Sequence, residues 1–313
     1  MIPSRADEIL STPPERHIPG LSPTRKRRAR RAFRALTAIS PALAARVAAY
    51  VFVRPRVRAI TPQDARFLQT ARGRRLSTAR GTVQVYEWTG SGPTVLVSHG
   101  WISHSARLRS VIEALQAKGL RVVAFDAPAH GRSTGSEADL HRFREALAAV
   151  SQACGPIEAI VAHSFGALAA ASWLAEDSSA SWLRAAVLVG VPRDVGYLFD
   201  SFTIALGLRA DVVARLRVLF LERYGRYPEQ YSACLLAQHI RAPVLLVHGG
   251  EDELVPVEHA GELVLQLPNG RMQVLAGMSH SEPLRDAQAV ELMADFVAER
   301  LLRDSPVRTA LAR

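Results

Sequence analysis

From residue 74 to residue 302, short apolar runs alternate with longer amphipathic stretches, and this alternation restricts the possible fold more than any other feature of the chain. The runs are rich in Val, Leu and Ala, as strands buried on both faces of a sheet are. Strands that alternate with helices form a mostly parallel sheet with helices on both faces. The sequence therefore predicts an α/β fold.

The individual elements follow from the same pattern. A hairpin is predicted first, because RRLSTA and TVQVYEW flank Arg80-Gly81 as two strands flank a tight turn. Strands are predicted at TVLVSHG, which is a continuous apolar run of the buried type, and at RVVAFD, IEAIVAHS, AAVLVGV, APVLLVHGG and RMQVLAG. Helices are predicted near residues 103–117, 138–153, 165–176, 257–266 and 284–302.

The stretch 193–240 contains no strand pattern and interrupts the alternation. Its segments YLFDSFTIALGL and VVARLRVLFLERYG are amphipathic, which predicts a small helical lid. Tyr197, Phe199 and Phe202 would then line a pocket for the apolar part of a substrate. Plain helix packing, without a pocket, is the alternative interpretation of the same amphipathic pattern.

Positive charge is concentrated near the beginning of the chain. Residues 1–80 carry a net charge of +14 and residues 81–313 a net charge of −4. Ser22, Ser40 and Thr61 each precede a proline, as an N-cap precedes the first helical residue, so an extra N-terminal helical segment is predicted. We divide the chain into five parts. A disordered leader (residues 1–21) precedes this basic helical segment (22–73), and the α/β core follows in two stretches (74–192 and 241–302). The lid (193–240) lies between the two stretches, and a tail (303–313) ends the chain.

Seven of the ten residues from 25 to 34 are Lys or Arg, and three interpretations of this basic segment compete. It is a solvated helix face, an anchor on an anionic membrane surface through residues 25–53, or an arm for nucleic acid. Phe33, Leu36 and Ile39 lie at helical spacing beside the charges, which suits a membrane surface. Nucleic acid is disfavoured, because no nucleic-acid-binding fold or interleaved aromatic pattern accompanies the charges.

Residues 35–53 do not predict a membrane span, because Pro41, Arg46 and seven alanines weaken the apolar signal. A signal peptide is not expected either, since the leader is long and Arg46 interrupts the apolar region. The expected location is the cytoplasm, with attachment to the inner face of the membrane as the open alternative. Cys154 and Cys234 are too few for a disulfide framework or a zinc site, so we expect buried free thiols and neither a metal nor a cofactor.

The segment AHSFG ends one predicted strand and begins a helix without an intervening loop. Ligands of open parallel sheets bind at the carboxyl ends of the strands, which is where this serine lies. Small residues at Ala162 and Gly166 flank Ser164 as the glycines do in the G-x-S-x-G turn, which presents a serine at a strained apex. Free backbone N–H groups at the start of the helix would stabilise an oxyanion there. Ser164 is therefore a candidate nucleophile.

Five stretches, VSHGW, FDAPAHGRS, AHSFG, LLVHGGEDELVP and LAGMSHSEP, resemble the α/β-hydrolase family in sequence and in order, over roughly residues 75–302. The resemblance implies the α/β-hydrolase fold and a bacterial-type, esterase-like serine hydrolase. It also implies Ser164 as nucleophile, Asp252 as acid and His280 as general base. The backbone N–H groups of Trp101 and Phe165 would form the oxyanion hole.

Several other polar residues at the same edge of the sheet compete for these roles. Glu251 and Glu253 flank Asp252, but the family pattern H-G-x-x-D-x-x-V-P selects the middle acid. The histidines at positions 99, 130, 163 and 248 and the acid at position 126 are expected to have structural roles, with the ring of residue 163 directed away from the nucleophile. Serine at the apex also argues against epoxide opening and dehalogenation, which use aspartate there.

The predicted function is hydrolysis of a carboxylic ester or thioester through an acyl-enzyme, on a small acyl substrate with an apolar part. Acyl transfer and peptide cleavage by the same three residues remain open. A catalytically silent protein that binds a membrane surface is a further alternative, because Ala162 replaces a glycine of the family pattern and the leader is strongly basic.

Overall fold

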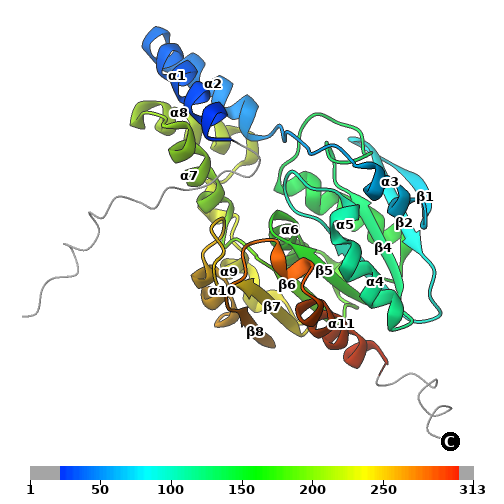
Figure 1. Ribbon diagram of the computed structural model, residues 1–313. Coiled ribbons are helices and arrows are strands. Elements are labelled where there is room, and N and C mark those ends of the chain that lie inside the picture. Colours follow the sequence, from blue (N-terminus) through cyan, green and yellow to red (C-terminus); the bar gives the residue numbers. More distant parts are fainter. Residues whose placement is uncertain (1–21, 303–313) are drawn as a thin grey trace, which may run out of the picture.

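The structure, a computed structural model, describes residues 22–302, so the predicted leader and tail lie outside the described residues. At its centre is an eight-stranded sheet of strand order β1-β2-β4-β3-β5-β6-β7-β8 (Figure 1). The strands are β1 (Arg72–Thr78), β2 (Gly81–Trp88), β3 (Thr94–Ser98), β4 (Arg121–Asp126), β5 (Ala159–His163), β6 (Ala185–Val189), β7 (Val244–Gly249) and β8 (Gly270–Leu275). β2 pairs antiparallel with β1 and β4, and the remaining neighbours are parallel, which confirms the predicted sheet.

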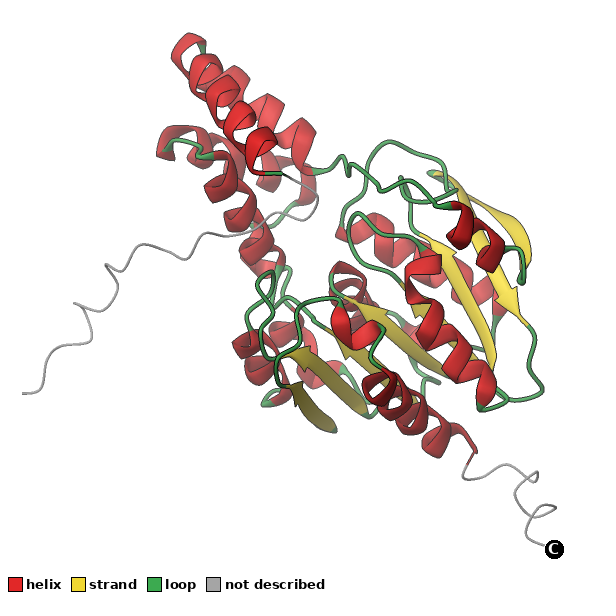
Figure 2. Ribbon diagram, viewed as in Figure 1, coloured by secondary structure: helices red, strands yellow, loops and turns green. Residues whose placement is uncertain are grey.

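Helices cover both faces of the sheet, as Figure 2 shows. Alternate residues of a strand therefore point into separate cores: Val95 and Val97 of β3 pack in one cluster and Leu96 in the other. One face is covered by α3 (Pro62–Leu68), α4 (Arg109–Ala117) and α11 (Ala287–Leu302), and the other by α5 (Leu140–Cys154), α6 (Phe165–Glu176) and α10 (Val257–Val264). The strands from β3 to β7 in the middle of the sheet are mainly apolar because helices cover both faces, and most of their polar residues lie at the strand ends.

Outside the sheet, α1 (Pro23–Ile39), α2 (Pro41–Phe52), α7 (Val195–Leu206) and α8 (Ala210–Tyr224) form a projecting bundle that we call the helical arm (Figure 1). α2 packs against α8, and α1 packs against α2 and α7. Ala44, Ala45 and Ala48 of α2 are fully buried, and their small side chains let α2 lie close to its neighbours. The arm thus joins the N-terminal segment to the stretch predicted as a lid, which ends in a short helix, α9 (Ala233–Leu236).

The helix starts predicted in the basic segment are confirmed. Ser40 accepts a hydrogen bond from the backbone N–H of Leu43 at 3.2 Å and caps α2. Thr61 and Asp64 form a capping box, in which the Asp64 carboxylate accepts the Thr61 backbone N–H at 3.1 Å. Serine or threonine followed by proline supplies both the cap and the first helical φ angle.

The apolar residues expected at a membrane surface are mostly used inside the arm. Phe33 is only 8% exposed and belongs to the same core cluster as the lid helices, and Leu36 packs against that cluster. Ile39, at 79% exposure, remains on the surface. Of the three side chains, only Ile39 is left exposed for a membrane surface, because Phe33 and Leu36 pack against the core cluster that includes α7 and α8. Within residues 22–302, no helix combines the length and the apolar character needed to cross a bilayer.

Both cysteines are free thiols. Cys154 is buried, and its sulfur accepts a hydrogen bond from Arg74 at 2.7 Å. Cys234, in α9, is partly exposed rather than buried, although its side chain packs against the apolar core. Burial raises the pKa of the Cys234 thiol to about 11, so it is protonated at neutral pH.

Candidate active site

Ser164 lies at the turn between β5 and α6, with no residue of either element between them. Its backbone has φ 55° and ψ −124°, in the left-handed half of conformational space that a residue with a side chain seldom adopts. The Ser164 N–H donates to Val189 O at 2.8 Å, and its carbonyl accepts from Ala167 N at 2.9 Å. Strain of this kind is retained where the surroundings enforce it, commonly at functional sites.

Two glycines make the sharp turn possible. A Cβ atom on Gly166 would lie 2.2 Å from the carbonyl oxygen of His99, so only glycine lets α6 approach the end of β3. A Cβ atom on Gly100 would lie 2.8 Å from Cβ of Ser164. Ala162, the departure from the family pattern, is fully buried in β5, where its methyl group packs in the core.

Asp252 and His280 form a short hydrogen bond, with Nδ1 of His280 2.6 Å from Oδ2 of Asp252. The Asp252 side chain is fully buried, and its Oδ1 accepts the backbone N–H groups of Leu254 and Val255, each at 2.9 Å. Burial works to raise the pKa of Asp252, but hydrogen bonds from His248 and His280 hold it well below its usual range. An ionised Asp252 keeps the proton of neutral His280 on Nδ1 and leaves Nε2 free to act as a base.

Two further glycines let neighbouring strand ends approach His280. A Cβ atom on Gly190, just after β6, would lie 3.0 Å from Cε1 of the His280 ring. A Cβ atom on Gly249, at the end of β7, would lie 2.3 Å from Met278 O in the His280 loop. Gly190 was not among the predicted site residues, although a glycine at the end of an apolar run was a signal that could have indicated it.

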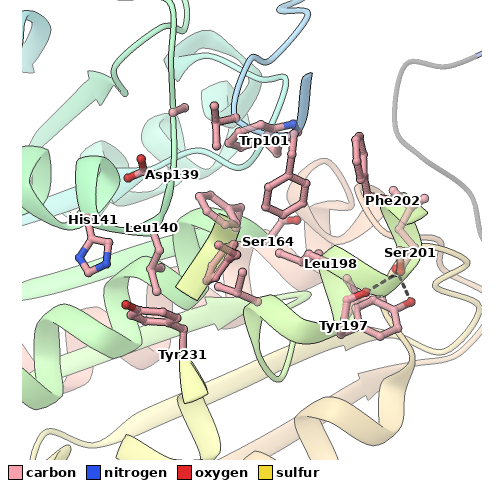
Figure 3. Close-up of a pocket in the computed structure, with 18 of the residues that line it drawn as sticks. Trp101, Asp139, Leu140, His141, Ser164, Tyr197, Leu198, Ser201, Phe202 and Tyr231 are labelled. Atoms are coloured by element: carbon pink, nitrogen blue, oxygen red, sulfur yellow. Dashed lines mark hydrogen bonds between the residues drawn. The ribbon is translucent and has the colours of Figure 1, made fainter. Parts of the chain in front are cut away.

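Ser164 and Trp101 line one pocket (Figure 3). His280 and Phe165 line the same pocket. Within residues 22–302, the Ser164 hydroxyl makes no hydrogen bond, so no protein group competes with a substrate for it. The backbone N–H groups of Trp101 and Phe165 are likewise without a hydrogen-bond partner among the described residues. These two donors suit the oxyanion-hole role assigned to them on the family resemblance.

Two buried histidines fix the turn that carries Trp101. His99 Nε2 accepts the Ala127 N–H at 2.9 Å, and His130 Nε2 accepts the Ile102 N–H at 3.2 Å. The Nδ1 atom of each ring faces a carbonyl oxygen, to which it donates, so each ring is a single neutral tautomer. Burial lowers the pKa of His99 to about 4 and that of His130 to about 3. Both have the structural role predicted for them.

Asp126 also has the predicted structural role. Its carboxylate is fully buried and accepts hydrogen bonds from both the backbone N–H and the hydroxyl of Ser105, each at 2.9 Å. The Tyr86 hydroxyl and the Arg132 N–H donate to the other oxygen, at 3.0 and 2.8 Å. Because both oxygens are engaged, Asp126 is not available as an alternative acid.

His163 and His248 contact the candidate acid and base more directly than the sequence indicated. Nε2 of His163 lies 3.1 Å from the backbone oxygen of His280, and the two rings are 4.7 Å apart. Nε2 of His248 lies 3.2 Å from Asp252 Oδ2 and 2.9 Å from Val255 O. Both histidines therefore position the Asp252–His280 pair, which sequence spacing alone did not reveal.

The pocket beside Ser164 is mostly apolar, and it is bounded by the core, the lid and the end of α2 (Figure 3). Its lining residues are Phe52, Val53, Trp101, Ala138, Asp139, Leu140, His141, Ser164, Phe165, Val195, Tyr197, Leu198, Ser201, Phe202, Phe220, Tyr224, Tyr231, Leu254, Val255 and His280. Tyr197 and Phe202 thus lie where the sequence placed them. Phe199 does not line the pocket, because it is fully buried behind Phe52, with ring centroids 5.7 Å apart.

The described residues contain no cluster of His, Cys, Asp and Glu side chains suited to a metal ion. The polar groups near Ser164 include His280 with its partner Asp252 and the backbone N–H groups of Trp101 and Phe165. This set is suited to nucleophilic attack on a carbonyl group.

Comparisons with known proteins agree with this architecture. Residues 91–233 match the model of a protein family described as serine aminopeptidase, S33. The chain is 26% identical over 249 residues to a non-heme haloperoxidase of Rhodococcus erythropolis, covering 64% of this chain and 90% of that protein. It is 27% identical over 225 residues to a monoacylglycerol lipase of Mycolicibacterium smegmatis, covering 59% and 80%. An esterase of Pyrococcus furiosus is similar in structure, with a TM-score of 0.59 and 24% identity over 80% of this chain and 97% of that one. The chain has the α/β-hydrolase fold.

Proposed function

Because this chain is an α/β-fold serine hydrolase, similar to esterases and lipases, we propose that it cleaves carboxylic esters or thioesters through an acyl-enzyme on Ser164. The observation that carries the proposal is the 2.6 Å hydrogen bond between Asp252 and His280, at the pocket where Ser164 is held at positive φ.

In the proposed reaction, Nε2 of His280 takes the hydroxyl proton as Ser164 Oγ attacks the substrate carbonyl. The carbonyl oxygen becomes an oxyanion that the N–H groups of Trp101 and Phe165 stabilise, at about 3 kcal/mol for each donor. His280 then gives the proton to the departing alcohol or thiol. A water molecule, deprotonated by the same nitrogen, releases the acyl group and restores the serine.

The pocket supports an acyl group with an apolar part. Leu140, Leu198 and Phe202 present hydrocarbon surface to it, and an acyl chain would be removed from water there. Asp139 is the carboxylate of the lining, but it caps α5 and accepts a hydrogen bond from Tyr224 at 3.2 Å. A peptidase that selects a free amino terminus needs an available carboxylate, so peptide cleavage is the weaker candidate. Acyl transfer differs only in the acceptor that replaces water.

A fluorophosphonate probe, which phosphonylates activated serines, tests the proposal. We expect the intact protein to be labelled, and Ser164→Ala and His280→Ala to lose labelling while keeping their circular dichroism spectra. Ser201→Ala is the matched control, because Ser201 lines the same pocket but donates its hydroxyl to Tyr197 O at 2.8 Å. Absence of labelling in the folded wild type would reject the hydrolase mechanism and favour the silent alternative. Competition between water and added alcohols for the acyl group would separate hydrolysis from transfer.

We further propose that the basic face of α1 attaches the enzyme from the cytoplasm to an anionic membrane surface. Arg27, Arg28 and Arg31 are exposed, and none of them forms an ion pair with another described residue. Basic residues close to an anionic surface contribute about 1 kcal/mol each. Sedimentation with phosphatidylserine vesicles should therefore weaken in the triple variant R27E/R28E/R31E, whereas phosphatidylcholine vesicles should bind neither protein. Equal binding of both proteins to the anionic vesicles would refute this attachment.

A further inference from the structure

The pocket has one wall that comes from outside the lid and the α/β core. Phe52 and Val53, at the end of α2, line it together with Ser164 and His280, although more than a hundred residues separate α2 from Ser164 in the chain. We propose that the N-terminal helical hairpin formed by α1 and α2 is a permanent part of the acyl-binding site, and that Phe52 determines which acyl chain lengths fit. This inference rests on the proposed esterase function and specifies its substrate.

The contacts of Phe52 explain how one residue acts on the pocket. Its ring packs edge-on against Phe202 at 5.1 Å, against Phe199 at 5.7 Å and against Phe220 at 6.4 Å between centroids. Phe199 is fully buried and Phe52 is partly exposed, so Phe52 lies between the aromatic interior of the arm and the pocket. A change in the size of this side chain changes the space available to a substrate, because the rings behind it cannot retreat into a packed interior.

The end of α2 is fastened to the core by a carboxylate. Glu137 binds Arg54, directly after α2 and Val53, at 2.8 Å, and it also binds Arg142 of α5 at 2.9 Å and Arg223 of α8 at 2.7 Å. The carbonyl of Val53 accepts the Ala138 N–H at 2.8 Å. One acidic side chain thus joins the hairpin, the core and the lid at the edge of the pocket.

The hairpin is also bound to the lid at the C-terminal end of α7. Arg30 of α1 donates from Nε to Ala205 O at 2.9 Å and from Nη2 to Ile204 O at 3.2 Å. These carbonyls lie in the last turn of α7, where helix carbonyls lack partners within the helix. Because α1 holds α7 and α2 packs on α8, the hairpin and the lid would move as one unit, and the Phe52 wall would stay in place.

The test is a series of p-nitrophenyl esters from acetate to hexadecanoate, assayed with the full-length wild type, Phe52→Ala, Phe52→Leu and Phe52→Trp. Fluorophosphonate titration gives the concentration of active serine in each preparation. Leu43→Ala is the matched control, because Leu43 lies on the same helix but is 45% exposed and outside the pocket.

The measured quantity is kcat/KM for the longest ester that the wild type accepts, divided by kcat/KM for acetate. We expect Phe52→Ala to raise this ratio by about tenfold. Phe52→Leu should change the ratio in the same direction by less, and Phe52→Trp should lower it. Titratable serine should stay near wild type in the Phe52 variants, and every value for Leu43→Ala should stay near wild type. An unchanged chain-length profile in all three Phe52 variants, with normal titration, would overturn the proposal.

Failure of the proposed function has a different signature. A wild type without titratable serine or esterase activity would refute the hydrolase mechanism and leave the wall to be tested by binding. In that case, the fluorescence of cis-parinaric acid, a long-chain fatty acid, measures occupancy of the pocket directly. Weaker binding by Phe52→Trp than by wild type and Leu43→Ala would support the wall, and identical binding by all three would reject it.

Discussion

The edge of the sheet that carries Ser164 and the helical arm beside it hold their side chains in different ways. At the sheet edge, contacts of the backbone hold the site: glycines allow close approach, and the buried rings of His99 and His130 each accept one hydrogen bond from the main chain and donate one to it. In the arm, packing of aromatic rings and arginine–carboxylate pairs join helices from distant parts of the chain. We infer that the sheet edge, where the chemistry is proposed, tolerates less change than the arm, because backbone atoms cannot move aside as side chains can.

The largest effect should come from Asp252→Asn. The amide keeps an oxygen for the Leu254 and Val255 N–H groups, but it turns the partner of His280 from an acceptor into a donor. The wrong tautomer of His280 should lower kcat about 10⁴-fold. Steady-state ester hydrolysis measures this, and Glu253→Gln serves as the neighbouring control that should retain full activity. Retention of most activity by Asp252→Asn would mean that another group orients His280.

Next in size is Gly166→Ala, which tests close approach at the sheet edge. The added Cβ would lie 2.2 Å from His99 O, a backbone atom that cannot turn aside. We expect a loss of about 3 kcal/mol in the free energy of unfolding and weaker fluorophosphonate labelling. Gly261→Ala in α10 is the matched control, because nothing lies within 4 Å of its Cβ position. Alanine there should stabilise the protein by about 0.5–1 kcal/mol. Equal changes in the free energy of unfolding at the two positions would mean that close approach at Gly166 does not fix the sheet edge.

Mild acid should weaken the sheet edge before the arm. Burial lowers the pKa of His99 to about 4 and that of His163 to about 3, so between pH 6.5 and 4 the unfolded chain binds protons that the folded protein does not. Stability is therefore lost as pH falls below 6.5, by about 2 kcal/mol for each such histidine at pH 5. Burial works to raise the pKa of Glu137, but Arg223 holds it below its usual range, so this ion pair keeps its charges until the pH is lower still.

Urea unfolding at pH 7.5 and pH 5 measures the loss of stability. Hydrogen exchange at the two pH values would show whether α1 and α2 remain as protected as before. His239→Gln is the control, because His239 is exposed and should leave the pH dependence unchanged. A free energy of unfolding that is equal at the two pH values would show that the buried histidines do not have the lowered pKa values given above.

The smallest effect is expected in the arm. Glu137→Gln should lower the free energy of unfolding by about 1 kcal/mol, because the carboxylate is partly exposed and ion pairs of this kind are screened by water and salt. Glu145→Gln, which removes an exposed pair with Arg80, should cost less. Chemical denaturation at low and high salt compares the two variants. A loss for Glu137→Gln as large as that of Gly166→Ala would mean that the arm is fixed as firmly as the sheet edge.

The sequence predicted the parts of the site that local patterns specify. Ser164 was predicted as a nucleophile from the small residues at Ala162 and Gly166 and from a strand that runs directly into a helix. Asp252 and His280 were predicted from the resemblance of two later stretches to the α/β-hydrolase family. Histidine partners could not be predicted in this way. His248 contacts Asp252 and His163 contacts the His280 backbone only because β5, β7 and the His280 loop lie side by side.

By itself, the sequence determined the order of strands and helices, the capped starts of α1, α2 and α3, and the residues placed at the strand ends. These follow from hydrophobic periodicity and from residues adjacent in the chain, which act at short range. Tertiary structure alone decided that Phe33 packs inward, that Phe199 lies behind the pocket and that Phe52 lines it. An amphipathic helix specifies that one face will be buried, but the surface that buries it comes from α7 and α8, far along the chain.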